Sequence, residues 1–282
     1  MERRTTNAKR RKYRITPDSI YSLSYTDFIG LVNQWNVPPG AFSTINKWAK
    51  FGSVNQESNV LEVGCSTGFS LRELALMTSC KGLGIDISKP SIRAAKLNKN
   101  LYFPHLRIEY KAIDAYKFEP KEKFSHIVFG AALRFFPDPY RMIDLAVGWL
   151  TDPGYILSCE FYITRPIPKR LVERARKVFD IEITQVGYKE VMKIYRDLEL
   201  IYEERNPIFQ ETKEELDFYT RSTVSRACEI LNIKDQKVYQ AMYERLYEIK
   251  NMSNVLRPYQ NYNVLVHRYR KNFYKRRFVE LF

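Results

Sequence analysis

The sequence predicts an α/β protein built on a doubly wound, mostly parallel sheet. Short apolar runs alternate along the chain with longer stretches whose apolar residues recur at helical spacing. The first runs end in glycine or in an acidic residue, and a helical stretch follows at once. Repeated units of strand, tight turn and helix are typical of an open sheet with helices on both faces.

The first such unit begins with the strand and turn of residues 59–70. Its apolar run ends at Val63, and Gly64 and Gly68 bracket the turn, where the absent Cβ permits unusual φ and lets a ligand approach the backbone. Glu62 is out of place on a buried strand, because an ionised carboxylate there is costly unless something pairs with it. The pattern therefore predicts a polar ligand at this turn.

The second unit, residues 81–88, ends its strand at Asp86, 18 residues after Gly68. An acidic residue at about that distance is placed to accept hydrogen bonds from a ribose diol. Nicotinamide enzymes cradle a pyrophosphate in G-x-G-x-x-G, whereas this turn is shorter and has Glu62 two residues before it. An acid suits a ligand that carries an ammonium group better than one that carries phosphate.

The same patterns predict the remaining elements. An aromatic-rich helical pattern covers residues 17–35, and a Pro-Pro-Gly break separates it from a helix at 42–51. Further strands are predicted at residues 107–114, 124–130, 155–162, 199–205 and 263–269, with a turn at 151–154. Further helices are predicted at residues 89–99, 139–150, 167–178, 187–198, 211–231 and 235–252.

Three of these segments resemble the motifs of class I S-adenosylmethionine-dependent methyltransferases. Residues 60–68 are similar to the first motif, an acid followed by G-x-G-x-G, with Ser66 in place of the usual middle glycine. Residues 84–88 resemble the second motif, and residues 113–115 the acidic tip of the third strand. The resemblance implies S-adenosyl-L-methionine as cofactor, S-adenosyl-L-homocysteine as product, and a seventh strand inserted antiparallel between the fifth and the sixth.

The resemblance also implies a cofactor site. Glu62 and the glycine turn are expected to hold the aminocarboxypropyl end, Asp86 the ribose and Asp114 the adenine amino group. Small residues after the fourth strand leave room for cofactor and acceptor. The expected cofactor-binding residues are Glu62, Gly64, Cys65, Ser66, Gly68, Asp86, Ile87, Asp114, Ala115, Gly130 and Ala131.

Two residues are candidates for catalysis. Glu160 lies near the end of the fifth strand, with Arg134 after the fourth. It is interpreted as a base, as a site for an ammonium substrate or as a paired structural carboxylate. Tyr25 belongs to the aromatic stripe of residues 17–35, which either packs on the core or forms a lid over the site. We expect Tyr21 or Tyr25 to contact the methionine or acceptor end of the cofactor pocket.

A different enzyme class fits part of the first motif. Gly64, Ser66 and Gly68 also satisfy the G-x-S-x-G nucleophile elbow of α/β-hydrolases, for which His267 is the plausible late histidine. That interpretation explains neither of the two strand-end acids, and no His-Gly-Gly segment for an oxyanion hole precedes the turn.

Composition indicates a globular protein, without a membrane span or a metal site. Hydrophobic residues make up 45% of the 282, and no apolar run approaches the roughly 20 residues that cross a bilayer. The basic N-terminus lacks the apolar segment of a secretory signal. The 4 cysteines and 3 histidines show no metal-ligand spacing, and unpaired thiols suit a cytoplasmic protein.

The net charge of +14 is concentrated at the two ends of the chain. Residues 1–14 hold seven Lys/Arg against Glu2, residues 267–282 hold six against Glu280, and the rest of the chain carries only +3. Basic tails are most often solvated arms, but they also bind RNA, an anionic membrane face or a phosphorylated substrate.

The expected function is methylation of a small-molecule acceptor, on nitrogen, oxygen or carbon, in an enclosed pocket. After the fourth strand the sequence lacks the Asn/Asp-Pro-Pro-Tyr/Phe motif used on exocyclic amino groups, and 20 tyrosines and 17 phenylalanines suit an aromatic pocket. The alternatives are an RNA (tRNA or rRNA) methyltransferase that uses the basic tails, and a non-catalytic binding protein of the same fold.

We expect one composite domain in four parts. Residues 1–14 form a basic flexible arm, and residues 15–163 form the lid helix and the Rossmann-like cofactor core. Residues 164–262 supply helical cap insertions around the sixth strand, and residues 263–282 the final strand and a basic tail.

Overall fold

The computed structural model describes residues 15–272. The predicted arm at residues 1–14 and the tail from residue 273 onward lie outside the described residues.

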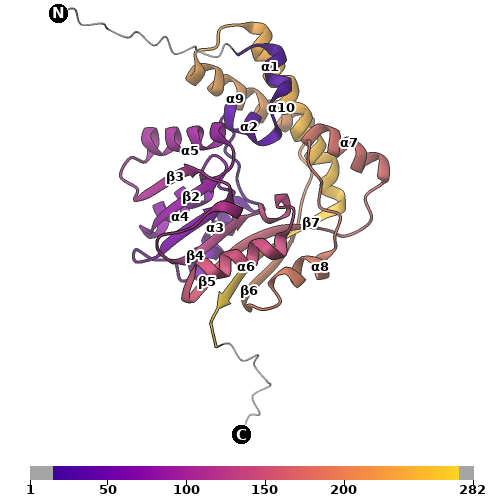
Figure 1. The fold of residues 1–282 in the computed structure, drawn as a ribbon. Helices are drawn as coiled ribbons and strands as arrows, with labels where there is room; N and C mark the ends of the chain where they lie inside the picture. Colours follow the sequence, from indigo (N-terminus) through magenta and orange to yellow (C-terminus); the bar gives the residue numbers. More distant parts are fainter. Residues whose placement is uncertain (1–14, 273–282) are drawn as a thin grey trace, which may run out of the picture.

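The centre of the molecule is a seven-stranded sheet in the order β3-β2-β1-β4-β5-β7-β6 (Figure 1). Six strands are parallel to one another, and β7 runs antiparallel between β5 and β6. The strands are β1 (Asn59–Val63), β2 (Lys81–Asp86), β3 (Ile108–Ala112), β4 (Phe124–Gly130), β5 (Leu150–Ile163), β6 (Glu199–Pro207) and β7 (Gln260–Tyr269). The predicted fold class is confirmed, including the antiparallel seventh strand. The strand order reverses between β1 and β4, and ligands of such sheets bind at the carboxyl ends of these strands.

Helices cover both faces of the sheet. One face carries α3 (Ala41–Phe51), α4 (Phe69–Thr78) and α5 (Lys89–Tyr102). The other face carries α6 (Pro139–Trp149), α8 (Tyr188–Met192) and the short 3₁₀ turns η1 (Ala115–Lys117), η2 (Leu133–Phe135) and η3 (Lys193–Tyr195). A fourth turn, η4 (Arg257–Tyr259), leads into β7.

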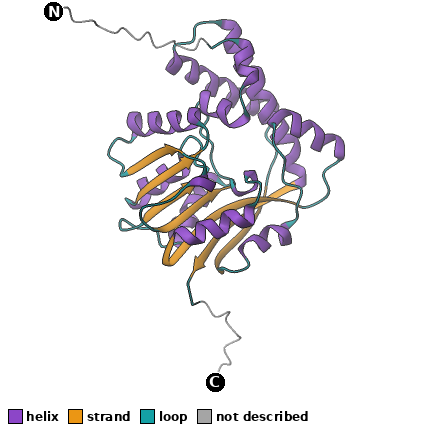
Figure 2. Cartoon of the chain, in the orientation of Figure 1, coloured by secondary structure: helices purple, strands orange, loops and turns teal. Residues whose placement is uncertain are grey.

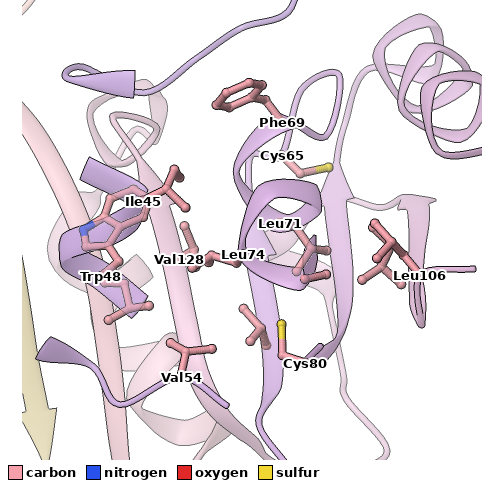
Figure 3. Close-up of a cluster of buried hydrophobic side chains, with 14 of the residues drawn as sticks. Ile45, Trp48, Val54, Cys65, Phe69, Leu71, Leu74, Cys80, Leu106 and Val128 are labelled. Atoms are coloured by element: carbon pink, nitrogen blue, oxygen red, sulfur yellow. The ribbon is translucent and has the colours of Figure 1, made fainter. Parts of the chain in front are cut away.

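Each face of the sheet has its own hydrophobic core, because side chains alternate between the two faces along each strand. On β1, Val60 packs into the cluster under α3 and α4, whereas Leu61 packs into the cluster under α6. Figure 3 shows the first cluster, in which Trp48 of α3 and Leu74 of α4 are buried near Val128 of β4. Glu62 follows Leu61 and therefore points toward the α3–α4 face.

A third cluster joins the two ends of the described chain in a helical cap. The cap consists of α1 (Pro17–Ser22), α2 (Tyr25–Leu31), α7 (Lys169–Phe179), α9 (Lys213–Leu231) and α10 (Gln236–Leu256), grouped on one side of the sheet in Figure 2. The Arg245 guanidinium of α10 donates hydrogen bonds to the carbonyls of Ile20 and Leu23, and it lies 4.5 Å from the ring centroid of Phe28. The cap is therefore closed by contacts between the first and the last thirds of the sequence.

The structure corrects several predicted boundaries. The helix predicted over residues 17–35 is two short helices, because Leu23 is extended and the Ser24 side chain accepts the Asp27 amide to start a new helix. The helix predicted at 187–198 is one turn of α8 followed by η3. The turn predicted at 151–154 lies within β5, and α10 continues to Leu256.

Across residues 15–272, none of the helices is both long enough and apolar enough to cross a membrane.

Candidate active site

The glycine turn after β1 is held in a compact, left-handed conformation. Gly64, Ser66 and Gly68 have φ angles of 72°, 47° and 79°. A Cβ on Gly64 would lie 2.7 Å from the Cβ of Ala132, and one on Gly68 would lie 2.5 Å from the Tyr110 ring. Glycine is therefore required at both positions, by conformation and by space. Ser66 takes the left-handed conformation although it is not glycine, so the departure from the usual motif leaves the turn intact.

Glu62 is a buried carboxyl beneath this turn. Its side chain is 3% exposed, and Oε2 accepts the Leu71 amide at the start of α4 at 3.1 Å. Burial raises the pKa of Glu62 to about 7, against the opposing hydrogen bonds of Ser70 and Leu71. A Cβ on Gly130 would come within 3.9 Å of Oε1, so the carboxyl faces the small residue that ends β4.

Asp86 connects the glycine turn to the turn between β2 and α5. One carboxylate oxygen accepts the Ser66 amide at 2.9 Å and the other accepts the Ser88 amide at 2.8 Å. Burial raises the pKa of Asp86 from its ordinary value, while these two hydrogen bonds oppose the shift. Each oxygen keeps a second lone pair, so the carboxylate is still able to accept two hydroxyl groups. Ile87, next along the chain, is 70% exposed and offers an apolar surface there.

The other predicted cofactor residues occupy the same edge of the sheet. Asp114 caps η1 by accepting the Tyr116 amide at 3.0 Å, and Ala115 follows it in the 3₁₀ turn. Ala131, with φ 60°, donates its amide to the Cys159 carbonyl at 3.0 Å. The Cys65 thiol is buried and burial raises its pKa, which leaves its backbone as the part available to a ligand. The structure thus brings the predicted residues together along the carboxyl ends of β1 to β4.

Residues 33–35, at the end of the segment predicted either to pack on the core or to form a lid, cross the glycine turn through hydrogen bonds that the sequence did not reveal. The Thr67 hydroxyl donates to the Gln34 carbonyl at 2.7 Å. Asn33 and Asn98 exchange two amide hydrogen bonds of 2.8 and 2.9 Å, and Asn98 also donates to the Thr67 carbonyl. Partners that lie 65 residues apart leave no local sequence signal.

Arg72 is a second feature that the sequence did not reveal. Its side chain is 1% exposed, and its guanidinium lies 4.9 Å from the ring centroid of Trp35 and within 5.6 Å of those of Phe69 and Phe103. Arg226 of α9 also lies over the Trp35 ring, and it donates to the Asn33 carbonyl at 2.9 Å. The crossing segment is therefore fixed both to the core and to the cap.

The two tyrosines predicted at the methionine or acceptor end make their contacts inside the cap. Tyr21 is 52% exposed, and its hydroxyl donates to Glu244 of α10 at 3.0 Å. The Tyr25 ring packs edge-on against Phe179 of α7 at 5.8 Å, and burial raises its pKa to about 12. Two other parts of this segment approach the cofactor residues: the start of α2, where Asp27 accepts the Ser88 hydroxyl at 2.6 Å, and the end of the segment, which crosses the glycine turn at Gln34.

Glu160, the other predicted catalytic residue, lies on the α6–α8 face of β5. It is 1% exposed, and Tyr195 of η3 donates a hydrogen bond of 3.3 Å to its Oε1. Burial raises the pKa of Glu160 to about 8, although the nearby Arg134 guanidinium and the Tyr195 hydroxyl oppose the shift. The carboxyl is thus mostly protonated at neutral pH.

The hydrolase alternative fails on geometry. Across the sheet, His267 pairs with Ile156, Ile156 with Ile127, and Ile127 with Leu61 in the middle of β1. His267 therefore lies at the middle of the strands and not at the edge of the sheet that carries Ser66. It stacks on Tyr195 at 4.5 Å, and burial lowers its pKa to about 3. Ser66 and His267 therefore do not form a catalytic pair.

Several solved structures are similar to this chain in fold. The crystal structure of the MccD protein is 26% identical over 83% of this chain and 99% of its own, with a TM-score of 0.65. A Geobacter sulfurreducens S-adenosylmethionine-dependent methyltransferase, crystallised with S-adenosyl-L-homocysteine, is 17% identical over 87% of this chain and 98% of its own, with a TM-score of 0.66. Coclaurine N-methyltransferase, bound to N-methylheliamine and S-adenosylhomocysteine, is 10% identical over 90% and 85%, with a TM-score of 0.60.

No curated protein sequence matches the chain. The model of the methyltransferase domain family matches residues 55–245, which include every element from β1 to α9. That match confirms the resemblance carried by the first motif, and this chain belongs to the methyltransferase domain family.

Proposed function

We propose that this protein transfers a methyl group from S-adenosyl-L-methionine to a small-molecule acceptor and releases S-adenosyl-L-homocysteine. The observation that carries the proposal is the meeting of Glu62, the glycine turn and Asp86 at the point where the strand order reverses. Glu62 receives the ammonium of the aminocarboxypropyl group, and Asp86 accepts the ribose hydroxyls. Ile87, Asp114 and Ala115 surround the adenine. Structural neighbours crystallised with the cofactor product support this assignment.

Methyl transfer from a sulfonium is an in-line displacement. The carbon–sulfur bond breaks as the acceptor lone pair forms the new bond, so the protein contributes mainly by holding both reactants in line. The acceptor atom loses a proton before or after the transfer. Glu160 is the group that we assign to this proton, because its raised pKa of about 8 makes its ionised form a stronger base than an ordinary carboxylate.

A small-molecule acceptor is favoured by the cap. Helices from both ends of the described chain gather beside the edge of the sheet that carries the cofactor residues (Figure 1). A cover of this kind excludes water from a reactive methyl donor. Tyr25 and the rest of α1 and α2 serve as part of this cover. Coclaurine N-methyltransferase, a structural neighbour, holds a small molecule beside its cofactor product.

Replacing Asp86 tests the cofactor assignment. Asp86→Ala removes both acceptors for the ribose diol, and calorimetric titration with S-adenosyl-L-homocysteine should show a loss of roughly tenfold to hundredfold in affinity. Asp86→Asn keeps one carbonyl acceptor and should lose less. Asp144→Ala, which removes an exposed aspartate of α6, is the matched control. Unchanged affinity in a folded Asp86→Ala protein would remove the ribose assignment.

A further inference from the structure

A second polar cluster lies beside the cofactor residues, around Arg134 in η2. Its Nε and Nη2 atoms are buried, and no group among residues 15–272 accepts a hydrogen bond from either of them. The side chain as a whole is half-buried, but buried N–H donors without a hydrogen-bonding partner are costly. Two N–H groups thus lack the hydrogen-bond acceptor that a ligand would supply.

The acid nearest to this guanidinium does not neutralise it. Glu160 lies close enough for Arg134 to lower its pKa, yet no ion pair joins the two side chains in the described structure. The polar groups beside the Glu160 carboxyl are Arg134 of η2 and Tyr195 of η3. Burial keeps the pKa of Glu160 above neutrality, so the carboxyl is largely protonated at pH 7 and leaves the positive charge of Arg134 uncompensated.

The cluster lies next to the cofactor residues in the sheet. Cys159, which precedes Glu160, is in register with Gly130, and Gly130 faces the Glu62 carboxyl. Arg134 follows Gly130 by four residues, through a tight turn at Ala131. An acceptor held by Arg134 would therefore reach toward the carboxyl ends of β1 and β4, where the cofactor residues meet.

We infer that the acceptor carries an oxyanion, a carboxylate or a phosphate, which binds to the Nε and Nη2 groups of Arg134. The planar guanidinium presents two parallel N–H donors in the geometry of a carboxylate or phosphate edge. Glu160, which is protonated in most molecules at pH 7, adds no opposing charge at this point. An acceptor bound at this point through a cation is disfavoured, because it would meet the positive charge of Arg134. This inference rests on the proposed methyl transfer.

The experiment titrates two simple oxyanions into the full protein saturated with S-adenosyl-L-homocysteine. Acetate represents the carboxylate and inorganic phosphate the phosphate, at pH 7 and at constant ionic strength with chloride. Binding is followed by the shift in melting temperature and by calorimetry. The wild-type protein should bind at least one of the two anions, and the tighter of them identifies the class of acceptor.

Arg134→Met should weaken that binding by roughly tenfold or more, because both N–H donors are lost. Arg134→Lys keeps the charge without the planar pair of donors, should bind with intermediate affinity, and is used if the methionine variant does not fold. Arg141→Met is the matched control, since Arg141 of α6 is exposed and stacks over the Tyr116 ring at 5.2 Å. The control should bind the anion as the wild type does.

The outcomes separate this inference from the proposed function. If the wild-type protein does not bind S-adenosyl-L-homocysteine, the proposed function fails. If it binds the cofactor product but neither anion, or if Arg134→Met and Arg134→Lys bind the anion as tightly as wild type, the oxyanion site alone is wrong.

Discussion

At the scale of single residues, the site depends on carboxyl groups that burial keeps from full ionisation. The pKa values of Glu62 and Glu160 are raised to about 7 and about 8. Burial raises the pKa of Asp86 as well, but two backbone amides stabilise its charged form and oppose the shift. Sequence reasoning identified all three acids, since an acid at the end of an apolar strand is unusual. It did not identify Arg72, because the rings that surround this guanidinium come from Trp35, Phe69 and Phe103, in three different segments of the chain.

The raised pKa of Glu62 predicts a pH-dependent affinity for the cofactor product. The ionised carboxylate attracts the ligand's ammonium, so the affinity for S-adenosyl-L-homocysteine should increase roughly tenfold from about pH 6 to about pH 8. The pKa of Glu62 is about 7 in the folded protein and 4.5 in the unfolded chain. Glu62 therefore contributes most to the free energy of unfolding below pH 4.5, and this contribution is lost as the pH rises through about 7.

Calorimetry across this pH range measures the change in affinity directly. The isosteric Glu62→Gln protein should bind more weakly and with an affinity that does not change between these pH values. A variant that keeps the wild-type increase would show that another group titrates.

At the scale of elements, α2 is placed by its contact with α5. A Cβ on Gly30 would lie 2.2 Å from the backbone nitrogen of Ser91, so the two helices touch through their backbones. The Asp27–Ser88 hydrogen bond and the bond from the Ser91 hydroxyl to the Thr26 carbonyl lie at the same contact. This docking places α2 beside the turn that follows Asp86, and thus beside the proposed ribose site.

A methyl group at Gly30 should therefore separate the two helices. Gly30→Ala should lower the free energy of unfolding by about 1–3 kcal/mol, as overpacking does, and should weaken binding of S-adenosyl-L-homocysteine. Gly148→Ala is the matched control, because a Cβ there meets nothing within 4 Å. In α6 it should be neutral or stabilise by up to about 1 kcal/mol. Equal unfolding midpoints for the two variants in urea would contradict the close contact.

At the scale of the whole molecule, the sequence predicted what local patterns encode. Most strands and helices were placed correctly because each unit carries its own periodicity and turn residues, but the turn at 151–154 and the helix at 187–198 were not. The order of β7 between β5 and β6 came from the family resemblance. The division of residues 17–35 into two helices was missed because it depends on the capping side chain of Ser24. The Asn33–Asn98 pair and the contacts of α1 with α10 were missed because their partners are distant in sequence.

The charge of the whole chain gives the test between a small-molecule and an RNA substrate. Deleting residues 1–14 removes a net charge of +6 and keeps Thr16, whose side chain caps α1. The deleted protein should bind S-adenosyl-L-homocysteine as the full chain does. Neither protein should transfer tritiated methyl groups from S-adenosyl-L-methionine to bulk tRNA or rRNA. Methylation of RNA that is lost on deletion, with a steep dependence on salt, would instead establish the RNA enzyme.

The cap has a consequence for the protein as it is being synthesised. The strands β1 to β5 and their helices are complete by residue 163, but Arg245, which holds α1, is made more than 220 residues after Ile20. A chain emerging from the ribosome thus exposes the apolar sides of α1 and α2 until α9 and α10 have followed. The cap beside the proposed site is completed only when α10 has been made, just before β7, and a nascent chain that stops before α10 has the residues for the cofactor without the complete cap.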